Sequence, residues 1–211
     1  ISIAAAGYVI NDYYDVKIDY VNRPNRVVVG RFLKRRSILF IHAALNAIGI
    51  IGGLLVSWEV GLINFFAAGL LWLYSNQLKR LALLGNTSVG FLTGMAVFVV
   101  YMLFKESIFL FSAYAFFAFF ISLIREIIKD MEDVEGDKKF DCKTLPIVIG
   151  QRYTKLVIYI IVLIFIGVVA ILLQEEPKFW YVLSGLTLML SILTYRLARA
   201  DKTIDFAKLS S

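Results

Sequence analysis

Two clusters of acidic side chains, far apart in the chain, are the part of this sequence best suited to chemistry. The first lies in the run NDYYDVKID and contains one amide and three carboxylates: Asn11, Asp12, Asp15 and Asp19. At about 100° per residue, these side chains share one face of a helix. The second cluster contains four carboxylates that share a narrower stripe if they lie on one continuous helix: Glu126, Asp130, Asp133 and Asp137. Two such acidic stripes can face each other across a cavity.

The chemistry that this arrangement favours is the binding of a metal ion together with a phosphorylated substrate. Carboxylates that share a cavity repel one another unless cations are present. Mg²⁺ prefers oxygen ligands and often binds substrate phosphates at the same time. We therefore predict a site for Mg²⁺ and a di- or triphosphate. The nearby pair Lys79 and Arg80 can donate hydrogen bonds to phosphate oxygens, and aromatic side chains can line an apolar chamber and stabilise a carbocation.

The elements that must hold these clusters are membrane-spanning helices. Hydrophobic residues make up 60% of the 211 residues and the mean hydropathy is +0.77, whereas soluble domains are about 45–50% apolar. Apolar runs that can cross about 30 Å of hydrocarbon lie at 1–20, 37–57, 60–78, 87–104, 108–125, 154–174 and 178–197. The chain begins inside one apolar run and ends as another segment starts, so we expect it to be truncated at both ends.

Basic residues concentrate in the connections on one side of the predicted bundle. The opposite side receives only Lys105 and Lys178. Because cytoplasmic loops carry an excess of lysine and arginine, we expect the basic side, which includes both acidic clusters, to face the cytoplasm from the cell membrane. This bias accounts for most of the net charge of +6 and gives no reason to expect nucleic-acid binding.

The sequence predicts one domain over 1–211 with a weak internal duplication. No linker divides the chain. In each half, an acidic helix end is followed by a basic loop with proline, a short Val/Ile run, a glycine and an arginine, so the repeats cover about 1–107 and 108–211. Membrane proteins built from repeats often place a site between the two halves. The single cysteine, Cys142, excludes an internal disulfide, and we interpret it as a structural thiol.

The two acidic motifs together resemble the signatures of the UbiA-type intramembrane prenyltransferase superfamily. The first signature, NDxxDxxxD, is matched in full by the first cluster, and the second, DxxxD, is matched by Asp133 and Asp137. The resemblance covers essentially the whole chain. It implies an all-α, multi-spanning transmembrane bundle around a central cavity. Members of the family have nine helices, of which this chain would hold about seven and a stub.

The activity that the resemblance implies is Mg²⁺-dependent transfer of a prenyl group from a polyprenyl diphosphate to a lipophilic acceptor. Metal ions, of which we expect two, would clamp the diphosphate and promote its departure. The implied ligands are Asn11, Asp15, Asp19, Asp133 and Asp137. Asp12 is suited to ligation or to a supporting role. Asp130 and Glu126 are alternative ligands, general bases, or partners for Arg125 or Lys129.

Residues that would bind the substrate follow from the same resemblance. The tract YSNQLKR is similar to the family's loop in which a basic pair helps to bind diphosphate. This implies roles for Lys79, Arg80 and Tyr74. Among the other basic loop residues, Arg23 and Lys143 are further candidates to contact phosphate.

The acceptor is less constrained by the sequence than the donor. The tracts NDYYDVKIDYVNRPNR, YSNQLKRLALLGN and DMEDVEGDKKFDCKTLP are most similar to the archaeal digeranylgeranylglyceryl phosphate synthase branch. That implies transfer of a geranylgeranyl group to geranylgeranylglyceryl phosphate in ether-lipid synthesis. One alternative is an aromatic acceptor, such as 4-hydroxybenzoate or a quinone precursor. Another alternative is a cation transporter, since intramembrane carboxylates also form ion paths, although a transporter is expected to place them near the midplane.

Overall fold

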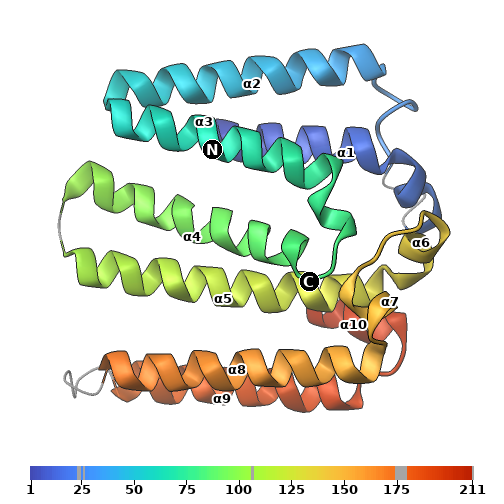
Figure 1. The fold of residues 1–211 in the computed structure, drawn as a ribbon, viewed down its shortest axis with the longest axis vertical. Helices are drawn as coiled ribbons and strands as arrows, with labels where there is room; N and C mark the ends of the chain where they lie inside the picture. The colour runs from blue at the N-terminus through green and yellow to red at the C-terminus, as the bar shows by residue number, and fades with distance from the viewer. Residues whose placement is uncertain (23–24, 26, 106, 174–179, 211) are drawn as a thin grey trace.

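The structure, a computed structural model, is helical throughout the residues that it describes, which are 1–22, 25, 27–105, 107–173 and 180–210 (Figure 1). The long helices are α1 (Ser2–Asn22), α2 (Arg35–Val56), α3 (Trp58–Asn76), α4 (Leu84–Phe104), α5 (Ile108–Glu132), α8 (Gln151–Leu173) and α9 (Trp180–Arg199). The short helices are η2 (Leu78–Arg80), α6 (Val134–Lys139), α7 (Leu145–Val148) and α10 (Thr203–Ser210). The predicted all-α fold, with seven long helices and a stub in this part of the chain, is confirmed.

Four of the long helices are both long enough and apolar enough to cross a membrane: α2, α4, α5, and α8 over Gln151–Ile171. In the most apolar 18-residue stretch of each helix, only 11% is buried inside the bundle for α2, for α4 and for α5. The corresponding share for α8 is 28%. Apolar side chains that are exposed over a whole helix are stable in lipid and unfavourable in water. The chain is therefore an integral membrane protein.

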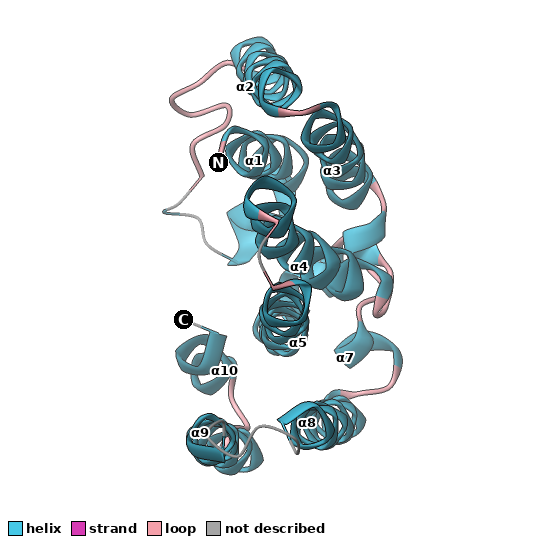
Figure 2. Ribbon diagram, turned by 90° about the vertical axis from the view of Figure 1, so that its left-hand side faces the viewer, coloured by secondary structure: helices cyan, strands magenta, loops and turns pink. Residues whose placement is uncertain are grey.

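The helices form three groups that lie side by side (Figures 1 and 2). In the first group, α1 packs against α2 and α3. In the second, α4 lies along α5; in the third, α8 pairs with α9, and α10 bridges from α9 to α5. Close approach of α4 to α5 depends on small residues. A Cβ atom added at Gly94 would lie 2.9 Å from the Ala115 carbonyl oxygen.

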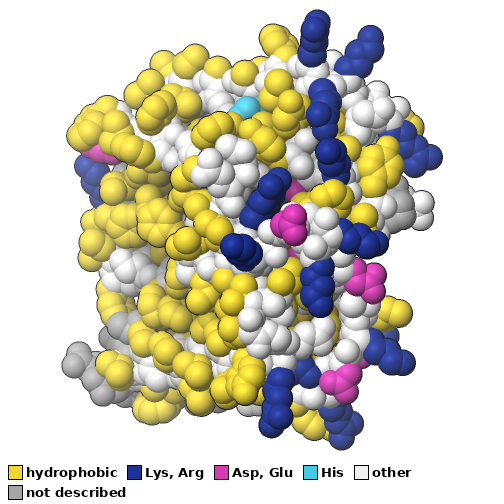
Figure 3. Space-filling model, turned by 45° about the vertical axis from the view of Figure 1, so that its right-hand side comes forward, with side chains coloured by type: hydrophobic (Ala, Val, Ile, Leu, Met, Phe, Trp, Pro, Cys, Tyr) yellow, Lys and Arg dark blue, Asp and Glu magenta, His cyan; other side chains and the backbone are white. Residues whose placement is uncertain are grey.

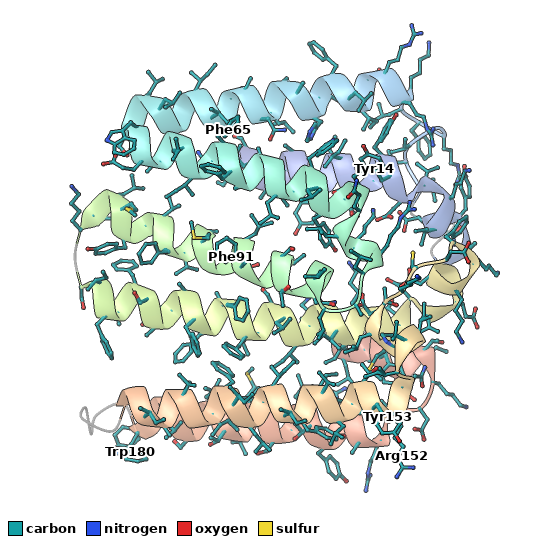
Figure 4. All side chains as sticks on the ribbon, viewed as in Figure 1. Tyr14, Phe65, Phe91, Arg152, Tyr153 and Trp180 are labelled. Atoms are coloured by element: carbon teal, nitrogen blue, oxygen red, sulfur yellow. The ribbon has the colours of Figure 1, made fainter. Side chains whose placement is uncertain are left out.

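The longer connections gather at one end of the bundle, where α6 and α7 lie (Figure 1). Backbone hydrogen bonding ties two of these connections together, because the Lys143 amide donates to the Arg80 carbonyl oxygen at 2.7 Å. Most lysine and arginine side chains of the visible face gather at this end, and apolar side chains predominate over the rest of it (Figure 3). Along α8 and α9, Arg152 and Tyr153 lie at the basic end and Trp180 lies at the opposite end (Figure 4).

The second acidic cluster does not lie on one continuous helix, so that prediction is wrong. Helix α5 ends at Glu132, and Asp133 joins it to α6 with φ −90° and ψ 7°. Glu126 and Asp130 therefore belong to α5, and Asp137 belongs to α6. The break changes the direction of the chain, because α6 turns toward α1 and contacts it.

The two loops that follow the acidic clusters share one backbone feature. Gly30 has φ +84° and Gly150 has φ +82°, a conformation that residues with a Cβ adopt at a cost of about 1 kcal/mol or more. These glycines occupy similar places in the predicted repeats, immediately before Arg31 and two residues before Arg152. The duplication itself stays a prediction.

We predict that replacing Gly94 by leucine weakens the bundle. The new side chain would meet backbone of α5, and overpacking of this kind costs about 1–3 kcal/mol. The melting temperature of the detergent-solubilised protein should fall clearly. Gly69→Leu is a matched control, because a Cβ there meets nothing within 4 Å. Equal melting temperatures for the two variants would contradict the packing described here.

Candidate active site

A cavity of about 360 Å³ lies where the ends of α1, α3 and α5 meet α6. Residues of both acidic clusters line it: Asn11, Asp12, Asp15, Asp19, Glu126, Asp130, Asp133 and Asp137. The structure thus brings together two motifs that lie far apart in the sequence. The size is typical of small-molecule sites, which occupy about 300–1,000 Å³.

The first cluster is organised around an ammonium group. On α1, the Asn11 side-chain amide donates to Asp15 Oδ2 at 2.8 Å, which the spacing of four residues on a helix allows. Lys79, from η2, donates from Nζ to Asp15 Oδ1 at 2.6 Å and to Asn11 Oδ1 at 3.2 Å. The Lys79 side chain is only 11% exposed. Burial lowers the pKa of Lys79, and the Asp15 carboxylate acts in the opposite direction.

Two carboxylates of the second cluster each accept a hydrogen bond from a neutral side chain. Asn86, in the first turns of α4, donates from Nδ2 to Asp130 Oδ2 at 2.8 Å. Thr144 donates from its hydroxyl to Asp137 Oδ2 at 3.3 Å. Both donors are buried, with exposures of 5% and 2%. They therefore fix the directions of two carboxylates that face the cavity.

The carboxyl group of Asp137 is electrostatically strained. Burial and, after it, the Asp133 carboxylate raise its pKa to about 6, against the opposing effects of the hydrogen bond from Thr144 and the charge of Lys129. A cation near Asp137 would relieve this strain, since it stabilises the ionised form.

Glu126 lies between two cations of its own helix. Arg125 Nη1 is 3.0 Å from Glu126 Oε1, and Lys129 Nζ is 3.9 Å from Glu126 Oε2. These are the partners that the sequence suggested among the alternatives for Glu126. Arg125 is also held from α10, because its Nε donates to the Ser210 carbonyl oxygen at 3.1 Å.

The predicted substrate-binding residues separate into three groups. Tyr74 and Lys79 line the cavity. Arg80 and Lys143 are exposed and are not among the lining residues. Arg23 lies outside the described residues. Because Arg80 and Lys143 meet through their backbones, their place in the fold is explained without a substrate.

Several residues that support or line the cavity were not found from the sequence. Asn86 and Thr144 act through hydrogen bonds across the fold, and the only signal for Asn86 was an amide just inside an apolar helix. Val27, Val28 and Val29, in the loop after α1, line the cavity itself. Val27 and Val29 are buried, with exposures of 5% and 2%, so they close one side of the cavity.

Cys142 lies on the cavity wall as a buried free thiol. Burial raises its pKa to about 11, with the Asp137 carboxylate acting in the same direction. Such a thiol is unreactive near neutral pH, which agrees with the structural role that the sequence suggested.

The donor atoms around the cavity suit a hard divalent cation. Within the described part of the chain, no three Asp, Glu, His or Cys side chains converge closely enough to hold a metal ion alone. The described lining nevertheless carries seven carboxyl groups and only two ammonium groups. An anionic diphosphate could not enter so negative a cavity without added positive charge. Mg²⁺ fits these groups, because it takes one or two carboxylates and completes its shell with phosphate oxygens and water.

The sequence is similar to known proteins of one kind. The model of the UbiA prenyltransferase family matches residues 1–210. The chain is 40% identical over 147 residues to the digeranylgeranylglyceryl phosphate synthase of Methanosphaera stadtmanae, covering 70% of this chain and 54% of that protein. It is 38% identical over 187 residues to the synthase of Methanosarcina mazei, covering 86% of this chain and 61% of that protein. The chain thus matches little more than half of the length of these relatives.

Solved structures share the fold. A digeranylgeranylglyceryl phosphate synthase structure is similar with a TM-score of 0.70 and 25% identity, covering 99% of this chain and 75% of that one. A UbiA homolog from Archaeoglobus fulgidus, bound to GPP and Mg²⁺, is similar with a TM-score of 0.80 and 17% identity, covering 99% of this chain and 80% of that one. The order and packing of the helices are therefore those of known membrane proteins.

We predict that Asn86 stabilises the fold through Asp130. Asn86→Ala should destabilise the protein by about 1 kcal/mol, because it removes the donor to a buried carboxylate. The same change in an Asp130→Ala background should have no further effect on thermal unfolding in detergent. Ser88→Ala is the control, since that hydroxyl bonds only within its own helix, to the Leu84 carbonyl oxygen. Additive effects of Asn86→Ala and Asp130→Ala would show that the two residues act independently.

Proposed function

The chain belongs to the UbiA prenyltransferase family, and from that premise we propose that it transfers a geranylgeranyl group from its diphosphate to geranylgeranylglyceryl phosphate. The observation that carries the proposal is the cavity on which both acidic motifs meet. The relatives with the highest identities quoted above are named digeranylgeranylglyceryl phosphate synthases, which supports this donor and this acceptor.

We assign the metal-binding role to the carboxylates and amide of the two motifs: Asn11, Asp15, Asp19, Asp133 and Asp137, with Asp12 and Asp130 beside them. When bound, Mg²⁺ neutralises the diphosphate and stabilises the negative charge that develops as it leaves. The proposal includes two ions, one for each motif. Support comes from the excess of carboxyl over ammonium groups on the described cavity wall and from the Mg²⁺ named with a structure of the same fold.

The chain's own residues prepare the donor for departure. Asn11 orients Asp15 through their hydrogen bond, and Lys79 lies against both. The Lys79 ammonium faces the cavity and can donate to a diphosphate oxygen in place of Asp15. Tyr74 and Tyr8 also line the cavity, and their ring faces can stabilise an allylic cation.

The bond changes are those of an ether synthesis. The carbon–oxygen bond between the prenyl group and the diphosphate breaks, and the electron pair leaves with the diphosphate. A bond forms between the same carbon and the acceptor hydroxyl oxygen. The hydroxyl proton passes to a carboxylate of the second cluster, where Asp130 and Glu126 both line the cavity.

Two features favour this function over the alternatives. The names of the relatives favour a phosphorylated lipid acceptor over an aromatic one. The carboxyl groups meet at one end of the bundle, beside the gathered basic side chains (Figure 3), whereas a cation transporter would place them near the midplane. The basic end further supports a site that faces the cytoplasm from the cell membrane.

We predict that neutralising either motif abolishes turnover. Asp15→Asn and Asp133→Asn should each lower the rate of geranylgeranyl transfer by about 100-fold or more, because each would weaken binding of the Mg²⁺ that stabilises the departing diphosphate. The assay measures ether product from labelled geranylgeranyl diphosphate and geranylgeranylglyceryl phosphate in the presence of Mg²⁺. Glu135→Gln is the control, because Glu135 is an exposed carboxylate on α6 that does not line the cavity. Its rate of transfer should be close to that of the wild type. Full activity in either motif variant would contradict the assignment.

A second prediction separates the cavity lysine from a loop lysine. Lys79→Met should raise the KM for geranylgeranyl diphosphate about tenfold, the effect of losing one hydrogen bond between charged groups. Lys143→Met should have a smaller effect, because Lys143 is exposed and does not line the cavity. A larger effect at Lys143 than at Lys79 would show that the diphosphate binds outside the cavity.

A further inference from the structure

The cavity contains a second ammonium group, Lys129, whose surroundings differ from those of Lys79. Lys79 is within hydrogen-bond distance of Asp15 and Asn11 and is 11% exposed. Lys129 Nζ is 3.9 Å from Glu126 Oε2, which is too far for a hydrogen bond, and its side chain is 35% exposed. The first ammonium group is thus held by the protein, and the second is held loosely.

Lys129 is not needed to balance the charge of Glu126. Arg125 contacts the other carboxylate oxygen at 3.0 Å. The position of Arg125 is itself fixed, since its Nε donates to the Ser210 carbonyl oxygen. A buried carboxylate with one close, well-oriented guanidinium already has a strong partner. Glu126 therefore does not depend on Lys129, whose charge also acts on Asp137 across the cavity and can attract an anion there.

The two lysines reach the cavity wall from different elements. Lys79 follows α3 and contacts α1, whereas Lys129 lies on α5, one residue before Asp130. A substrate pair with two separate anionic groups would match this arrangement. The diphosphate of the donor is one such group, and a phosphate on the acceptor is the other.

We propose that Lys129 binds the phosphate of the acceptor and so selects a phosphorylated glycerol lipid over acceptors without phosphate. This inference rests on the proposed function and deepens it. A phosphate among seven carboxyl groups would be repelled without a nearby cation. Lys129 lines the cavity beside the second cluster, and its ammonium group supplies that positive charge.

The test compares two acceptors: geranylgeranylglyceryl phosphate and geranylgeranylglycerol, which lacks the phosphate. In Lys129→Gln, the KM for the phosphorylated acceptor should rise about tenfold, as expected for one lost charge-assisted hydrogen bond. The KM for geranylgeranylglycerol and that for geranylgeranyl diphosphate should change by less than about twofold, within the scatter expected of a lost surface charge. Lys129→Arg should recover most of the affinity, because it keeps the charge. Lys139→Gln, at an exposed position on α6, is the matched control.

Each other outcome has a definite meaning. Equal increases in KM for both acceptors, without recovery in Lys129→Arg, would show that Lys129 only supports the acidic cluster, and the inference would be wrong while the proposed function stands. An increase confined to geranylgeranyl diphosphate would place Lys129 in the donor site and would also overturn it. If the wild-type protein used only an acceptor without phosphate, the proposed function would fail first, and this inference with it.

Discussion

Repulsion between carboxyl groups that share one cavity is the constraint on which the rest of this structure depends. Burial and neighbouring negative charge both oppose ionisation, so every carboxylate here needs a donor or a cation. The fold supplies them from different elements: Lys79 for Asp15, Asn86 for Asp130, Thr144 for Asp137 and Arg125 for Glu126. These partners hold the acidic groups in place, and only Lys79 and Arg125 among them carry a positive charge. What remains is a preformed negative cavity that favours a divalent cation and a phosphorylated ligand.

Packing between helices keeps the partners of these carboxyl groups in position. Close contact between α4 and α5 brings Asn86 beside Asp130, and the backbone hydrogen bond from Lys143 to Arg80 holds η2 against the segment after α6. The helices expose apolar surface to lipid along most of their length. The carboxyl groups of the cavity lie at the end where the connections gather, where water and ions can reach them at the least desolvation cost.

The sequence was sufficient to predict what depends on local spacing and composition. Helical periodicity placed the first cluster on one face of α1, and hydropathy located the long helices. The sequence could not predict the break at Asp133. The helical pattern of charged residues continues through the position at which the chain changes direction. Nor could it find Asn86 or Thr144, whose hydrogen bonds depend on how separate elements pack. Arg80 was expected near phosphate from the resemblance of its loop, and Lys143 as a basic loop residue, but the structure exposes both side chains at the surface. The ligand roles of the motif residues stay predictions.

The central claim is that the two acidic clusters form one cation-dependent site for a prenyl diphosphate. It is tested most directly by equilibrium binding of geranylgeranyl diphosphate to the purified protein at increasing Mg²⁺ concentration, without acceptor. We expect binding to require Mg²⁺ and to weaken at least tenfold, about 1.4 kcal/mol, when either Asp15 or Asp133 is replaced by asparagine. Equally tight binding in the presence of a chelator, or binding unaffected by both replacements, would contradict the account.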